Sequence, residues 1–203
     1  MLISLFLFFK TPDMKLTKQS VIFLFILVAV TTLVKVICAP RIDLSGFSCV
    51  LAVSLFAGLM IKEKKLAFLL PLLTLFISDA LLQLLHALNL FPYAGFYGGQ
   101  IYNYALFILL TLIGIGLRNF KTAGIIAAAF IGPTIFFLLS NFIVWKTQGT
   151  AMGYGNDLNG LIQCYTFGLP FYRNSLISTI LFLPTFIALY NWLTYGRFSL
   201  ARA

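Results

Sequence analysis

The sequence has very few charged residues. They make up 9% of its 203 residues, compared with about a quarter in ordinary soluble proteins. Acidic residues are the scarcest, with 5 Asp and Glu against 14 Lys and Arg, while 61% of the residues are hydrophobic. A chain of this composition cannot cover a water-exposed surface with polar side chains, so it is predicted to be an integral membrane protein.

Histidine and cysteine are also scarce, with 1 His and 3 Cys and no CxxC pair. We therefore expect no metal site, because zinc needs several such ligands, and no cofactor, because no Gly-rich phosphate loop is present. Cys164, His86 and Arg173 could form a membrane cysteine transpeptidase or protease site, but no nucleophile signature surrounds them, so no enzyme is predicted. Whether Cys38 and Cys49 form a disulfide stays open.

Long apolar runs recur along the chain and do not alternate with polar residues, which excludes a β-barrel and predicts transmembrane helices. The predicted fold class is an all-α polytopic membrane helix bundle of six transmembrane helices. The spans are expected at residues 20–38, 47–61, 66–88, 100–117, 122–145 and 174–195. The second span is short for a hydrocarbon core of about 30 Å.

Basic residues orient the predicted bundle. They gather before the first span, in alternate connections and after the last span, so the positive-inside rule places both termini in the cytoplasm of a bacterial inner-membrane protein. Topology explains the net charge of +9, and no nucleic-acid partner is expected. The expected segments are a cytoplasmic or interfacial N-terminus (1–19), a transmembrane domain (20–195) with an extracytoplasmic loop (146–173), and a cytoplasmic tail (196–203). Met14 is an alternative start.

The third predicted span carries a polar face in its outer half. Asp79, Gln83 and His86 follow one another at helical spacing, so they lie on one side of the helix. A carboxylate at membrane depth is either paired or part of a functional cavity. Two interpretations of Asp79 stay open, a structural pair with His86, Lys35 or Arg173, and contact with a ligand. Lys35 itself is expected to extend toward the interface.

Other polar and aromatic side chains are predicted in the same outer leaflet, and we interpret them as a pocket that is covered by the glycine-containing loop 146–173. The predicted ligand-binding residues are Asp79, Gln83, Asn103, Asn141, Trp145, Tyr165 and Arg173.

Small residues at spacings of four let helices approach closely. The predicted helix-packing residues are Ser54, Gly58, Gly124, Ala128 and Gly132.

Three blocks of the sequence carry a resemblance. They are "APRIDLSGFSCVLAVSLFAG", "PLLTLFISDALL" and "SNFIVWKTQGTAMGYGNDLNGLIQCYTFGLPFYRNSL". With these blocks the chain resembles a family of uncharacterised bacterial six-span membrane proteins. The arrangement in turn is similar to the substrate-binding subunits of energy-coupling-factor vitamin transporters, although the first span lacks their AxxxA pattern.

That resemblance implies a function. The protein would bind a metabolite or a vitamin-like molecule in the outer leaflet, and a membrane coupling protein with ATPase subunits would move the loaded bundle within the lipid bilayer. The alternative is a non-enzymatic accessory subunit of a larger inner-membrane complex, in which protein side chains fill the predicted pocket.

Overall fold

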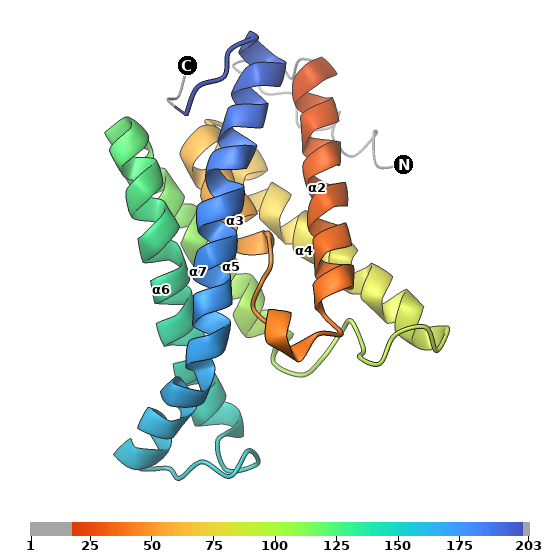
Figure 1. Cartoon of the computed structure of the whole chain (residues 1–203), viewed down its shortest axis with the longest axis vertical. Helices are drawn as coiled ribbons and strands as arrows, with labels where there is room; N and C mark the ends of the chain where they lie inside the picture. The colour runs from red at the N-terminus through yellow and green to blue at the C-terminus, as the bar shows by residue number, and fades with distance from the viewer. Residues whose placement is uncertain (1–17, 201–203) are drawn as a thin grey trace.

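The computed structural model describes residues 18–200 (Figure 1). The predicted N-terminal segment as far as residue 17, with Met14, and the last three residues lie outside the described part. The described residues form helices and no strand, which confirms the all-α class. The α-helices are α2 (Lys18–Cys38), α3 (Val50–Met60), α4 (Lys64–Ala87), α5 (Gln100–Leu117), α6 (Lys121–Gln148) and α7 (Leu158–Tyr195). Two 3₁₀ turns, η1 (Ile42–Leu44) and η2 (Arg118–Phe120), lie between them.

Several of these helices are long and apolar enough to cross a membrane. Within residues 18–200 the qualifying stretches are Lys18–Cys38, Lys64–Ala87, Gln100–Gln148 and Leu158–Tyr195. The third stretch contains both α5 and α6, which turn back on each other at η2 and pack together. The helices therefore support the membrane protein that the composition predicts.

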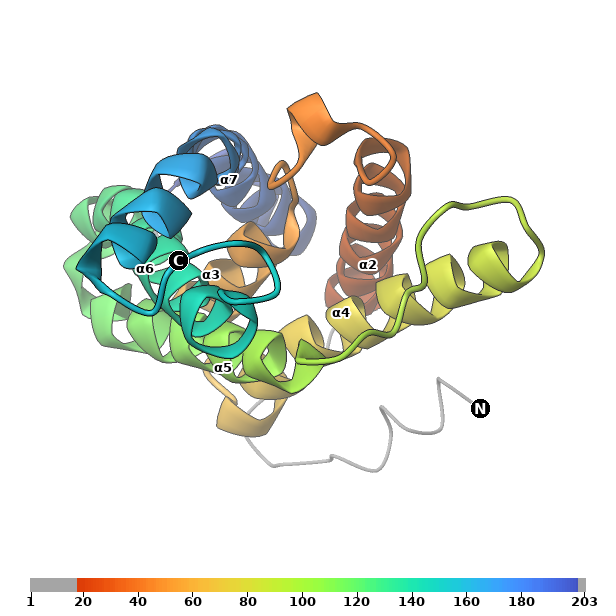
Figure 2. The same cartoon turned by 90° about the horizontal axis from the view of Figure 1, so that it is seen from below.

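Helix α3 lies at the centre of the bundle, with the other helices around it (Figure 2). All of its residues from Val50 to Met60 are buried. The Phe56 ring of α3 packs against Phe23 of α2 and Tyr190 of α7, with ring centroids 5.4 and 5.6 Å away. The sequence predicted a membrane span at 47–61, but α3 has only 11 residues. A helix of that length covers about 16 Å, roughly half of the hydrocarbon core.

Arg118 binds the C-terminal end of α3. Its Nε donates a hydrogen bond to the Gly58 carbonyl (3.1 Å), and its Nη2 donates to the Gly58 and Ile61 carbonyls (2.7 and 3.2 Å). The last carbonyls of a helix have no partner within that helix, and they carry partial negative charge. The Arg118 guanidinium donates hydrogen bonds to these carbonyls and places a positive charge beside their partial negative charge.

Side chains of α7 hold the segment that leads into α3. Asn174 Nδ2 donates to the carbonyls of Asp43 (2.8 Å) and Ser45 (2.9 Å). The hydroxyl of Ser175 donates to the Gly46 carbonyl (2.9 Å), and the hydroxyl of Ser178 donates to a carbonyl further along the same segment (3.2 Å). The backbone of residues 43–48 is thus bonded to α7, and we call these contacts the α7 clamp.

The connection between α6 and α7 is shorter than predicted. The sequence predicted one loop over residues 146–173, but α6 continues to Gln148 and α7 begins at Leu158, so only residues 149–157 lie between them. Asp157 caps α7, because its side chain accepts a hydrogen bond from the Gly160 amide (2.9 Å). Amides and glycines suggested a loop, but α7 accommodates them and bends in the turns around Pro170 (Figure 1).

Glycines allow α3 and α5 to cross at close range. A Cβ atom on Gly58 would lie 2.2 Å from the Thr111 carbonyl oxygen and 2.8 Å from the Gly114 Cα. The other small residues of the predicted packing set are also at helix contacts. Ser54 and Ala128 are fully buried, a Cβ on Gly132 would meet the Leu55 side chain, and a Cβ on Gly124 would meet the Leu117 carbonyl.

The α3–α5 crossing gives a matched pair of substitutions on α5. In Gly114→Ala the new Cβ would lie 2.6 Å from the Leu55 carbonyl oxygen, whereas a Cβ on Gly116 meets nothing within 4 Å. We expect Gly114→Ala to destabilise the protein by about 1–3 kcal/mol through overpacking. Gly116→Ala should be neutral or stabilising by up to about 1 kcal/mol, because alanine favours helix. Thermal unfolding in mild detergent measures both, and equal midpoints for the two variants would contradict the close crossing.

The α7 clamp predicts protease sensitivity. Asn174→Ala leaves two carbonyls without their donor, at a cost of about 1–3 kcal/mol. We expect this variant to be cut by trypsin after Arg41 several times faster than the wild type. Arg173→Ala is the matched control, because Arg173 is its exposed neighbour on α7 and makes no part of the clamp. Unchanged cleavage after Arg41 in Asn174→Ala would rule out the clamp.

Candidate functional site

A buried polar network joins α2, α4 and α5 around Asp79. The Lys35 ammonium forms a salt bridge with Asp79 Oδ1, and Gln100 Nε2 donates a hydrogen bond to Asp79 Oδ2. Lys35 Nζ also donates to the Ser78 hydroxyl (3.2 Å). The Asp79 side chain is only 4% exposed, while that of Lys35 is 22% exposed. Both carboxylate oxygens therefore have protein partners, and of the partners considered from the sequence, Lys35 is the one in contact.

The next polar residue on α4 organises the loop after that helix. Gln83 Oε1 accepts hydrogen bonds from the backbone amides of Gly95 (3.1 Å) and Phe96 (3.2 Å). On α5, the Asn103 amide donates to the Tyr97 hydroxyl of the same loop. Gln83 and Asn103 thus fix the loop between α4 and α5.

Tyr97 and His86 belong to this loop region between α4 and α5. Desolvation raises the pKa of Tyr97 above its ordinary value; the hydrogen bond from Asn103 opposes this shift and the negative charge of Asp79 adds to it. The Tyr97 hydroxyl therefore stays protonated at neutral pH. His86 Nδ1 lies 3.0 Å from the Phe91 carbonyl, so the histidine contacts the loop backbone.

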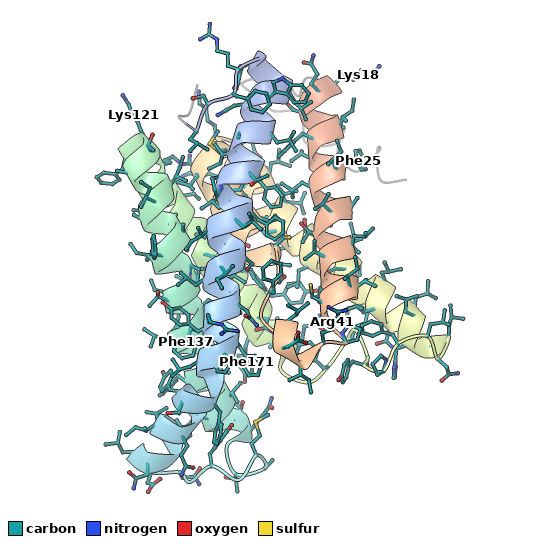
Figure 3. The ribbon with its side chains drawn as sticks, in the orientation of Figure 1. Lys18, Phe25, Arg41, Lys121, Phe137 and Phe171 are labelled. Atoms are coloured by element: carbon teal, nitrogen blue, oxygen red, sulfur yellow. The ribbon has the colours of Figure 1, made fainter. Side chains whose placement is uncertain are left out.

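Three of the predicted ligand residues hold the C-terminal end of α6 and the N-terminal end of α7 together. The Phe137 ring of α6 packs between Tyr165 and Tyr172 of α7, with centroids 5.6 and 4.8 Å away (Figure 3). The polar contacts are Cys164 Sγ to the Asn141 carbonyl (3.4 Å), Trp145 Nε1 to the Gly155 carbonyl (2.9 Å) and Tyr165 Oη to the Leu138 carbonyl (2.8 Å).

The predicted ligand residues thus fall into two groups. One group lies on α4 and α5 with Asp79, and the other lies between α6 and α7 with Asn141. Arg173 lies in neither group and is exposed on α7. Each group bonds mainly to its own neighbouring segments.

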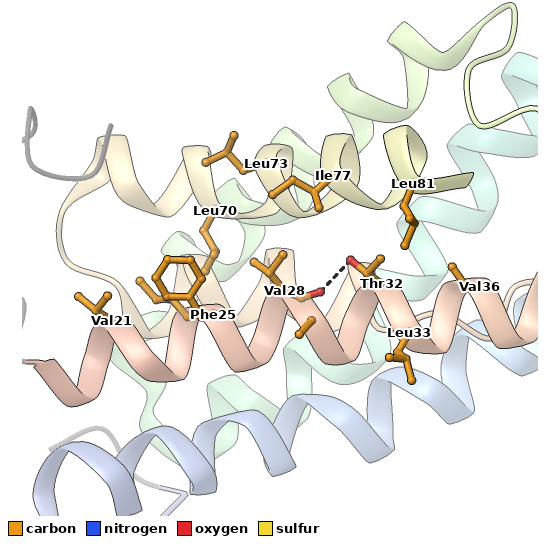
Figure 4. Close-up of a pocket in the computed structure, with 12 residues that line it drawn as sticks. Val21, Phe25, Val28, Thr32, Leu33, Val36, Leu70, Leu73, Ile77 and Leu81 are labelled. Carbon is orange, nitrogen blue, oxygen red and sulfur yellow. Dashed lines mark hydrogen bonds between the residues drawn. The ribbon is translucent and has the colours of Figure 1, made fainter. Parts of the chain in front are cut away.

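A cavity of about 490 Å³ lies between α2 and α4 (Figure 4). It runs from Val21 to Val36 on α2 and from Leu70 to Leu81 on α4. Its lining residues are apolar except for Thr32, whose hydroxyl donates to the Val28 carbonyl (2.8 Å). None of the seven predicted ligand residues lines this cavity.

Sequence reasoning named Lys35 as one of three possible partners of Asp79 but did not choose among them, and it expected the Lys35 side chain to extend toward the interface. Lys35 lies about 26 Å along α2 from Lys18, and Asp79 lies about 22 Å along α4 from Lys64. These similar depths are the signal that pairs them. No comparable signal identified Gln100 as the second partner of Asp79.

The fold and the network define a class, that of an all-α protein with membrane-length apolar helices, two of which are joined by an ion pair. The model of a family of unknown function, designated DUF6580, matches residues 15–200. The chain belongs to that family, as the resemblance to an uncharacterised family predicted. Comparison with curated proteins gives no match, and comparison with solved structures gives none. No similarity to the vitamin-transporter subunits is found, so that resemblance stays an expectation.

The ion pair predicts a double-mutant cycle. Asp79→Ala leaves the partly buried Lys35 ammonium without its counter-charge, and removing one partner of a buried pair costs about 3–5 kcal/mol. We expect the double variant Lys35→Met/Asp79→Ala to recover most of that loss. Thermal unfolding in detergent provides the measurement, with Asp43→Ala as the control because Asp43 is exposed. A double variant as unstable as Asp79→Ala would contradict the pair.

Proposed function

We propose that the protein is a membrane-embedded binding subunit that holds a small molecule for a transport system. In this proposal the bundle lies in a bacterial inner membrane with both termini in the cytoplasm, as the distribution of basic residues predicts. The observation that carries the proposal is the cavity of about 490 Å³ between α2 and α4. Its volume lies within the range of sites that bind small molecules in proteins, about 300–1,000 Å³.

The ion pair of the polar network supports this cavity. Lys35 adjoins Val36, and Asp79 follows Ile77 by two residues, and both Val36 and Ile77 line the cavity. The salt bridge therefore joins the two helices beside the outer part of the cavity and helps to set their separation. Its role is to hold the walls in place, while the apolar lining contacts the ligand.

In this function the protein binds its ligand and does not transform it. The cavity lining offers no general acid, base or nucleophile, since its side chains are apolar apart from the Thr32 hydroxyl. Movement of the loaded subunit would require energy from partner proteins, which we propose to be a membrane coupling protein with ATPase subunits.

A second candidate is favoured by a different observation. Six of the seven predicted ligand side chains form hydrogen bonds within the protein. They are Asp79, Gln83, Asn103, Asn141, Trp145 and Tyr165. Polar side chains that are already hydrogen-bonded within the protein have few groups left to bind a polar ligand. This arrangement fits an accessory subunit of a larger inner-membrane complex, which binds no small molecule.

Purification from native membranes in mild detergent, followed by mass spectrometry of all co-purifying molecules, tests the two candidates. The binding subunit predicts a non-protein molecule that is released on denaturation, together with an integral membrane partner and an ATPase. A protein partner at fixed stoichiometry with no small molecule would contradict the binding function and favour the accessory subunit.

A further inference from the structure

The α2–α4 cavity offers a ligand nothing polar to bind. Thr32 provides the single hydroxyl of the lining, and that hydroxyl already donates to the Val28 carbonyl. A polar group placed inside would lose its hydrogen bonds to water without replacement, which costs several kcal/mol in an apolar environment. The part of a ligand that occupies the cavity must therefore be hydrocarbon.

The cavity is also long and narrow. The 15 helical steps from Val21 to Val36 span about 22 Å at about 1.5 Å per residue. A volume of about 490 Å³ over that length gives a mean cross-section of roughly 22 Å². An α-helix about 10 Å wide needs roughly 80 Å². An extended hydrocarbon chain needs roughly 16–20 Å², because carbon atoms of neighbouring molecules approach to about 4 Å. The dimensions fit one extended chain lying inside the cavity, which is too small to enclose a whole helix.

The cavity opens sideways. Three of its lining side chains are well exposed on the outside of the bundle, Leu33 (60%), Phe25 (43%) and Leu81 (37%). All three belong to helices of membrane-spanning length, so the opening faces the bilayer. A molecule that enters by this route comes from the lipid phase.

Exposed basic residues lie beyond both ends of the cavity. Lys18 begins α2 one turn before Val21, and Arg41 follows the other end of α2 (Figure 3). Lys35 and Asp79 form their salt bridge beside the last turn of the lining. A molecule with an apolar chain in the cavity would place a polar head at one of the two ends. The matching chemistry is that of an amphiphile whose chain lies parallel to α2.

We propose that the α2–α4 cavity binds one hydrocarbon chain of a membrane phospholipid, with the head group at one end of α2, at the level of Lys18 or of Arg41. This inference rests on the proposed binding function and names the class of its ligand. The lipid enters laterally between Leu33 and Leu81. Inside the cavity its chain contacts the apolar side chains of α2 and α4 instead of the chains of neighbouring lipids.

Native mass spectrometry of the protein ejected from phosphatidylcholine nanodiscs tests this inference. We expect one retained phospholipid per protein. Ala29→Phe places a ring in the cavity and should reduce retention at least fivefold, because Ala29 lines the cavity and is exposed. Val30→Phe is the matched control, since Val30 is the next residue on α2, is 38% exposed and does not line the cavity. It should retain the lipid as the wild type does.

A phosphatidylcholine with a photoreactive group in its acyl chain gives an independent readout that does not need a variant. The label should fall on residues 21–36 and 70–81 in preference to other lipid-facing helices. Uniform labelling, or equal retention in Ala29→Phe and the wild type, would overturn the inference. If purification from native membranes yields a water-soluble metabolite instead, the binding function stands and the lipid assignment fails. If it yields no small molecule at all, both fail.

Discussion

Every backbone polar group at membrane depth needs a partner inside the protein, because the hydrocarbon core offers no water. This constraint shapes the centre of the bundle. Helix α3 is too short to reach both interfaces, so both of its ends must be satisfied by neighbours. Arg118 binds the carbonyls at the C-terminal end, and the α7 clamp binds the carbonyls of the segment that leads into the N-terminal end. Asn174, Ser175 and Ser178 of α7 thus provide partners for the backbone beside this short helix.

The same constraint explains why the predicted ligand residues do not meet. Asp79 carries a charge that would be costly in isolation, and it binds Lys35 and Gln100. Trp145 and Tyr165 each bind a backbone carbonyl of the α6–α7 hairpin. Once each polar group is bonded to its own surroundings, the cavity that remains is apolar. The ligand class that we propose for it is accordingly lipid-like, whereas the sequence predicted a metabolite or vitamin-like molecule bound among the polar residues.

The sequence predicted well what depends on local composition. Long apolar runs located α2, α4, α5 and α6 to within a few residues, because a helix in lipid satisfies its own backbone. The prediction failed where contacts between helices determine the structure, at the start of α7 and in the partner of Asp79. The last span was predicted to begin at Asn174, yet α7 already begins at Leu158. In this added part Gly168 packs against Asn141 and Phe137 of α6, and Gly160 packs against Gly155 of the preceding loop. The Lys35–Asp79 pair joins residues 44 positions apart, and its partner choice depends on how α2 and α4 cross.

The central claim is that α3 and the segment before it are held inside the protein by side chains of α7 and by Arg118. Hydrogen exchange of the protein in lipid nanodiscs measures this directly, because it reports the protection of each backbone amide. The account predicts slow exchange from residue 50 through 60, comparable to that in the middle of α5, and fast exchange in residues 149–157. Fast exchange in α3 would mean that its short helix opens to water, and the account would be wrong.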